Sequence, residues 1–337
     1  MARFVLVFSV WLFVAMLASD PASSQQALQL WNTRTVNCGA CSSFAKAWWV
    51  EAFSPVIRGY SYPQSRGVVE EFIERTVQHL NAAAIGRAND PALRDRLLAA
   101  AQNKAFLKLD FGASGGASPS FLHAVMVETV AYAVSYLRGR NALDPAQLKV
   151  IDGWGCALLK GAATKAGSRD HKAILASASV AWGAAVGDAG LFNSGAAKLK
   201  TIVSGVKGNK GFAPDIRNAN EVMHHVIGGA HILRLNGRDL FSDNLHSAVA
   251  AHAKAVTELG TAKVKTSGDP ADQAWSILRA QGFGTHVAWV PVYLANFPSG
   301  GASAEVRALD KRVRQSDRSA YWGMQMGIHT GCLMGRW

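Results

Sequence analysis

The sequence lacks the features that mark several large classes of protein. Beyond the first 24 residues, no apolar run is long enough to span a membrane. Convincing alternating strand patterns are scarce, and no exact internal repeat is visible. There is no basic tail, no arginine-rich run and no nucleic-acid-binding motif that we recognise. These absences argue against a membrane-spanning protein, an all-β protein and a nucleic-acid-binding protein.

Cysteine is also rare, with four residues in 337: Cys38, Cys41, Cys156 and Cys332. Outside the cytosol, four cysteines allow three disulfide pairings, and the sequence does not choose between them. Cys38 and Cys41 have the spacing of a redox motif, but no thioredoxin-like strand and helix surround them. We therefore favour a structural disulfide or buried thiols over redox chemistry or metal binding.

The N-terminus has the pattern of a secretory signal peptide, which we assign to residues 1–24. Arg3 supplies the positive charge, residues 4–18 form an apolar core, and small residues at 22–24 favour cleavage. The alternative is an uncleaved membrane anchor, for which the apolar run is short. We expect residues 25–337 to form a single domain that acts in the periplasm or is secreted, with no stable membrane insertion after cleavage.

The charge of the chain favours an anionic partner. Lysine and arginine number 35 against 23 aspartates and glutamates, which gives a dispersed net charge of +12. A positive surface attracts nucleic acid, anionic lipid or acidic polysaccharide. Export argues against nucleic acid, so we expect the partner to be an acidic polysaccharide. We also expect the protein to be a monomer.

Helical patterns occupy most of the chain. Asp90 is a candidate N-cap for a helix with Pro91 in its first turn, and Asp144-Pro145 opens another. Ten to twelve helices in one domain would pair antiparallel, as a toroid or a solenoid. The predicted helices cover 70–84, 91–107, 119–137, a segment from 145, 170–187, 190–206, 217–236, 243–259, 270–281 and 303–315.

One predicted helix carries the main candidate site. Arg217, His224 and His231 stand seven residues apart, so two helical turns separate each from the next on one face. An arginine and two histidines offer fixed positive charge, titratable nitrogen and hydrogen-bond donors to one groove. This pattern indicates a site that grips and deprotonates an acidic substrate.

Three segments resemble a known family, the alginate lyases of polysaccharide lyase family five, which are poly(mannuronate) lyase-like. In the segment Gly211–Phe241, Arg217 falls on the family's arginine and His225 on the second histidine of its His-Tyr-His phrase. Asp170-His171 lies where the family has Asn-His, and Trp289–Tyr293 is similar to a downstream family phrase. The N-terminal part matches weakly, through Tyr62 and Arg66, at the family's mobile lid loop.

The resemblance implies an all-α fold, an α/α toroid or incomplete α/α barrel of antiparallel helix pairs. It implies a cleft that binds a uronate polymer and cleaves it by β-elimination, with no cofactor and no metal. His171 and Arg217 match the residues that neutralise the substrate carboxylate. Two positions depart from the family: its asparagine is Asp170 here, and its proton-transferring tyrosine is His224. Histidine titrates closer to neutrality than tyrosine, so we expect His224 to carry the proton.

Alternatives stay open at this point. The chain is alternatively a catalytically silent protein that binds an acidic glycan in the same basic cleft, or an unrelated helical scaffold. Asp170 either lies in the cleft or caps a helix. His225 and His231 either bind substrate or support the cleft, and a zinc site with His224 is disfavoured because adjacent histidines diverge on a helix.

Overall fold

A computed structural model of the chain describes residues 66–84, 89–109, 118–164, 167, 169–206, 216–258, 287–316, 322–323 and 328–329. The predicted signal peptide, Tyr62, three of the four cysteines and the predicted helix 270–281 lie outside these residues. Arg66 and Arg217 lie on described helices, but their side chains are outside the description.

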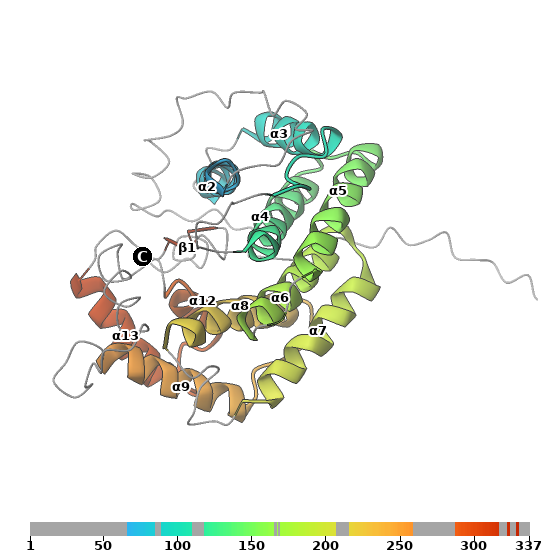
Figure 1. The fold of residues 1–337 in the computed structure, drawn as a ribbon. Coiled ribbons are helices and arrows are strands. Elements are labelled where there is room, and N and C mark those ends of the chain that lie inside the picture. The colour runs from blue at the N-terminus through green and yellow to red at the C-terminus, as the bar shows by residue number, and fades with distance from the viewer. Residues whose placement is uncertain are drawn as a thin grey trace, which may run out of the picture.

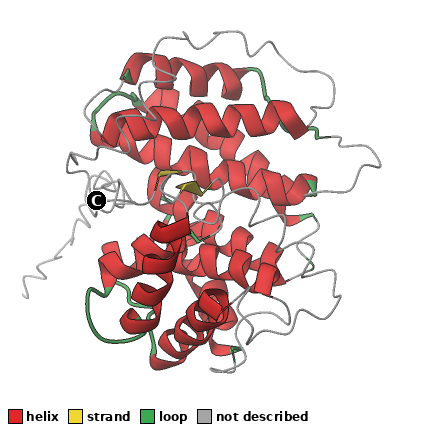
Figure 2. Ribbon diagram, turned by 90° about the vertical axis from the view of Figure 1, so that its left-hand side faces the viewer, coloured by secondary structure: helices red, strands yellow, loops and turns green. Residues whose placement is uncertain are grey.

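Helix dominates the described secondary structure, and the only strands in it are a pair of two-residue strands (Figure 2). The all-α prediction is therefore confirmed. The helices are α2 (Arg66–Ala84), α3 (Asp90–Gln102), α4 (Pro119–Gly139), α5 (Pro145–Ala163), α6 (Arg169–Val186), α7 (Ala189–Ser204), α8 (Ile216–Leu235), α9 (Asp243–Glu258), α12 (Trp289–Asn296) and α13 (Ser303–Ser316). The strands β1 (Trp322–Gly323) and β2 (Ile328–His329) pair antiparallel.

The helices form two curved layers (Figure 1). In the inner layer α2 packs on α4, α4 on α6, α6 on α8 and α8 on α12. The outer layer contains α3, α5, α7, α9 and α13, and the β1–β2 pair lies on the concave side, where β2 contacts α2. Because each inner helix is followed along the chain by an outer one, the inner helices run parallel to one another.

Side-chain caps set where several helices begin. Asp144 accepts a hydrogen bond from the Gln147 amide (2.8 Å), and the Gln147 side chain accepts from the Asp144 amide (3.1 Å), which completes a capping box. Ser118 caps α4 through the Phe121 amide (3.2 Å). The start of α4 and of α5 therefore agrees with the sequence prediction.

Two predicted helix ends need correction, and one helix was not predicted. Asn89, and not Asp90, caps α3, since its side chain accepts from the Ala92 amide (3.1 Å). The same helix ends at Gln102 and does not reach residue 107, because Lys104 and Phe106 adopt positive φ angles of 50° and 64°. Helix α12 has no counterpart among the predicted helices, since its eight residues include a proline.

Helix α4 is apolar on nearly every side. It is long and apolar enough to cross a membrane, yet 83% of its most apolar window is buried inside the fold. Inner-layer helices are covered on one side by their neighbours and on the other by the outer layer. The composition of α4 is therefore that of a core helix.

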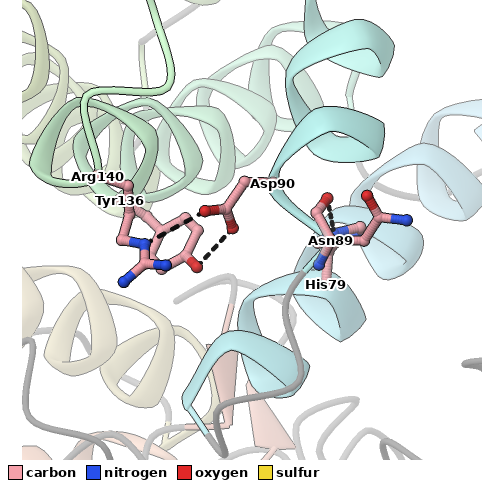
Figure 3. A network of polar contacts seen from close by, with 5 residues as sticks. All are labelled: His79, Asn89, Asp90, Tyr136 and Arg140. Carbon is pink, nitrogen blue, oxygen red and sulfur yellow. Dashed lines mark hydrogen bonds and ion pairs between the residues drawn. The ribbon is translucent and has the colours of Figure 1, made fainter.

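A polar network joins α2, α3 and α4 (Figure 3). The Tyr136 hydroxyl donates to Asp90 Oδ1 (2.7 Å), and Arg140 Nε donates to Asp90 Oδ2 (3.2 Å). The His79 ring donates from Nε2 to the carbonyl oxygen of Asn89 (2.7 Å). Burial is the main cause that raises the pKa of Tyr136, and the hydrogen bond to Asp90 adds to it. This phenol therefore stays protonated and acts as a donor.

A second network joins α8, α9 and α12. The side-chain oxygen of Asn220 accepts from Trp289 Nε1 (3.0 Å) and from His252 Nε2 (3.2 Å). His252 and Trp289 are buried, and burial lowers the pKa of His252 to about 4. In the folded protein this imidazole is therefore neutral near pH 6.

The network of Figure 3 gives a first prediction. Replacing Tyr136 by phenylalanine removes one hydrogen bond to Asp90 and should lower the free energy of unfolding by about 1 kcal/mol. Urea denaturation followed by circular dichroism measures this change. The control is Glu71→Gln, which removes an exposed ion pair with Arg75 and should change stability by less than about 0.5 kcal/mol. Equal effects of the two changes would contradict the assigned role of Tyr136.

His252 gives a second prediction. Its pKa falls from 6.5 to about 4 on folding, so only the unfolded chain gains a proton in that window. The contribution of His252 to the free energy of unfolding is therefore fully present above pH 6.5. It should fall by about 3 kcal/mol between pH 6.5 and 4. The variant His252→Gln should show a flatter pH dependence of the urea midpoint. An unchanged slope would contradict the prediction.

Candidate active site

The inner helices α4, α6 and α8 line a small cavity, to which polar and apolar residues both contribute. Its volume of ≈ 10 Å³ is about that needed for one water molecule. Five of the lining side chains carry polar groups that face one another across three helices. The lining comprises Glu128 and Tyr132 on α4, Ser177 and Ala181 on α6, and His224, His225, Gly228 and Ile232 on α8.

An ion pair crosses this cavity from α4 to α8. His225 Nδ1 lies 3.2 Å from Glu128 Oε2, and the two residues are 1% and 4% exposed. Burying a carboxylate is costly unless an opposite charge lies close to it. The pair therefore ties the middle of α4 to the middle of α8 and brings net charge within the cavity to zero when His225 is protonated.

Tyr132 and Ser177 complete the polar part of the lining. Burial raises the pKa of Tyr132 well above its ordinary value, and the nearby charge of Glu128 raises it further. The phenol therefore stays protonated and offers one donor to the cavity. Ser177 adds a hydroxyl from α6.

His224, the predicted proton carrier, lies inside this cluster. It is 0% exposed, lines the cavity, and its ring centroid lies 6.3 Å from that of His225. The two adjacent histidines therefore share one cavity, although the sequence pattern predicted that they would diverge.

His171 lies in the first turn of α6 and is not part of the cavity lining. It is partly exposed, and its ring centroid lies 5.5 Å from that of Phe121 in the first turn of α4. The Phe121 ring lies 6.3 Å from the ring of His225. The Phe121 ring thus lies near both the partly exposed His171 and the buried His225.

Asp170 and Arg217 lie at the same end of the inner layer. Asp170 is the second residue of α6, so it lies inside the first turn and is not the N-cap, where its charge complements the helix dipole. Arg217 is the second residue of α8, and its spacing of seven places it on the face of His224. Helices α4, α6 and α8 all begin toward this end of the inner layer.

His231 is placed elsewhere. Its Nδ1 accepts a hydrogen bond from Asn296 Nδ2 of α12 (3.0 Å), and it does not line the cavity. Burial lowers the pKa of His231. The structure therefore brings His224 and His225 together but turns His231 toward α12. In the described part of the chain, no three histidine, cysteine or acidic side chains form a metal-binding group.

Sequence reasoning missed Glu128, Tyr132 and Ser177, because no recognised motif contains them. One signal was present: Glu128 is the only charged residue between Pro119 and Leu137, in a helix that is otherwise apolar or uncharged. A lone carboxylate inside an apolar helix indicates a buried partner.

Comparisons with known proteins locate the fold. No family model and no curated protein matches the sequence. Among solved structures, a histidine-to-alanine variant of alginate lyase A1-III complexed with tetrasaccharide is similar, with a TM-score of 0.61 and 15% identity over 88% of this chain and 92% of that chain. Alginate lyase A1-III from Sphingomonas species A1 matches with a TM-score of 0.57 and 17% identity, over 83% of this chain and 84% of that chain. A tyrosine-to-phenylalanine variant complexed with tetrasaccharide gives 0.57 and 15%, over 90% and 95%.

These likenesses confirm the predicted α/α toroid. They also confirm the resemblance to alginate lyases as that of a divergent chain, at identities of 15–17%. At such identities the likeness concerns the fold and does not extend to the residues of the site.

The buried ion pair gives a third prediction. Replacing His225 by leucine leaves the carboxylate of Glu128 without its opposite charge and should cost about 3–5 kcal/mol of stability. The double variant Glu128→Leu/His225→Leu should be more stable than the single one, because it buries no charge. Urea denaturation at pH 7 measures both. A double variant less stable than the single variant would show that the pair does not behave as a buried ion pair.

Proposed function

We propose that the protein binds a uronic-acid polysaccharide and cleaves it by β-elimination, after export to the periplasm or the cell exterior. The observation that carries this proposal is the position of His171. It lies partly exposed in the first turn of α6, and the Phe121 ring lies near both it and the buried His225. The alginate lyase fold over most of the chain supports the substrate class.

The reaction sets clear physical demands. A base removes the proton on C5 of a uronate, the C4–O4 bond breaks with its electron pair going to O4, and O4 receives a proton. A C4=C5 double bond remains on the new non-reducing end. The C5 proton is weakly acidic while the carboxylate is fully charged, so donors or cations must stabilise the enolate-like state.

The candidate residues that meet these demands lie at two levels along the inner helices. His171 and Arg217, at the helix N-termini, bind and neutralise the carboxylate, assisted by the positive ends of three helix dipoles. His224, about two turns deeper on α8 than Arg217, carries the proton. The carboxylate of Asp170 lies in the first turn of α6, where the helix dipole offsets its charge.

One observation favours a second candidate function, the binding of an acidic glycan without turnover. His224 is fully buried, and the cavity that it lines holds about one water molecule. A binding protein would use His171, Arg217 and the helix N-termini in the same way, without a proton carrier that reaches the sugar.

A turnover assay gives the fourth prediction. Incubation with polymannuronate, polyguluronate or polyglucuronate across a range of pH should raise the near-ultraviolet absorbance, as unsaturated uronate ends form. His224→Ala should lower kcat by about 10²-fold or more with little effect on binding. His171→Ala should lower kcat/KM by about 10²-fold, because it removes a donor to the developing charge.

Lys149→Ala, an exposed change on the outer helix α5, is the matched control and should leave both constants unchanged. Binding of a polymer without any absorbance signal would sink the lyase proposal and favour the silent glycan-binding protein. Turnover that survives His224→Ala would show that another group carries the proton.

A further inference from the structure

Glu128 differs from the other acidic residues of the described fold in its burial. Of the acidic side chains in the part of the chain that the structure describes, it is the only buried one. It lies on the inner helix α4, one helix away from the candidate residues of α6 and α8. A carboxylate at this depth destabilises the fold unless it is paired, so its presence indicates a role beyond packing.

A close contact and a shared cavity link Glu128 to His224, the candidate proton carrier. Its Oε2 lies 3.2 Å from His225 Nδ1, and both residues line the cavity that His224 also lines. Within the described residues, His225 Nε2 has no hydrogen-bond partner. Both His225 and His224 line this cavity, which is about the size of one water molecule.

Helices α4, α6 and α8 place polar side chains in the cavity that His225 lines. Helix α4 contributes Glu128 and Tyr132, and α6 contributes Ser177, which does not titrate. Helix α8 itself contributes His224. Helices α7, α9 and α12 also pack against α8 but supply no residue to the cavity. Glu128 is therefore the one anionic side chain of the lining.

We propose that Glu128 is a positioning residue for His224, acting through His225 and their shared cavity. This inference rests on the proposed lyase function. The carboxylate lies 3.2 Å from His225 Nδ1 and so fixes the orientation of the His225 ring, which shares its cavity with His224. It also fixes the rotation of α8 relative to α4, which sets the direction of His224.

The test is Glu128→Gln, which keeps the shape of the side chain and removes its charge. We expect kcat to fall about tenfold while KM stays within about twofold, because the residue does not touch substrate. The pH profile of kcat should also move to lower pH, because removing an anion disfavours the protonated form of a nearby imidazole. The conservative variant Glu128→Asp should restore the position of the profile.

Two controls separate positioning from packing. Glu71→Gln makes the same chemical change in an exposed ion pair and should leave kcat and the pH profile unchanged. In the background of His225→Gln, Glu128→Gln should have little further effect, because the path from Glu128 to His224 is already broken. Assays are run at a temperature at which circular dichroism shows every variant folded.

The outcomes are distinct. A wild type without turnover on any polymer overturns the lyase function and this inference with it. A wild type with turnover, combined with a Glu128→Gln variant that has an unchanged pH profile and only a lower unfolding temperature, overturns this inference alone. Full additivity of the two substitutions in kcat would likewise overturn the route through His225.

Discussion

The inner layer of helices is covered on both sides, and this constraint governs the rest of the structure. A side chain on α4, α6 or α8 meets either a neighbouring inner helix or the outer layer, so apolar residues occupy most positions. Any polar group that these helices bury must find a partner, or its desolvation destabilises the fold. The few polar residues that remain there therefore point to a site more strongly than polar residues on the outer layer do.

The cluster of Glu128, Tyr132, Ser177, His224 and His225 meets this constraint only in part, because His225 Nε2 has no hydrogen-bond partner within the described residues. A carboxylate is matched by an imidazole at 3.2 Å, and a phenol kept protonated by burial supplies a donor. In the proposed function, the N-terminal ends of these helices would attract the anion and the buried cluster would handle the proton.

The sequence predicted the helices well because their boundaries depend on local chemistry. Proline, aspartate, serine and glycine near 118, 144 and 237 act within a few residues, and the helices begin and end close to where these residues predict. The resemblance to alginate lyases supplied the toroid, which periodicity alone left open between a toroid and a solenoid. Helix α12 escaped prediction because its short length and internal proline resemble a loop.

The candidate site was harder to predict, because it depends on contacts between distant segments. The spacing of seven placed Arg217, His224 and His231 on one face, but the position of α12 and its Asn296 determines where His231 points. Glu128 is 97 residues from His225 along the chain, and no periodicity links the two. Such pairs become visible only when the order of the helices around the layer is known.

Burial also bears on the histidine at position 224, where the resemblance to alginate lyases implies a tyrosine. Desolvation disfavours the charged form of any side chain, so it raises the pKa of a phenol and lowers that of an imidazole. Both effects occur in this protein: burial raises the pKa of Tyr132, and it lowers the pKa of His252 and of His231. A proton acceptor must be unprotonated before it acts. A buried phenol is therefore a poor acceptor, whereas burial away from a carboxylate favours the neutral form of an imidazole, which accepts a proton. In the proposed function, a histidine at position 224 thus suits the task of proton acceptor better than a tyrosine would.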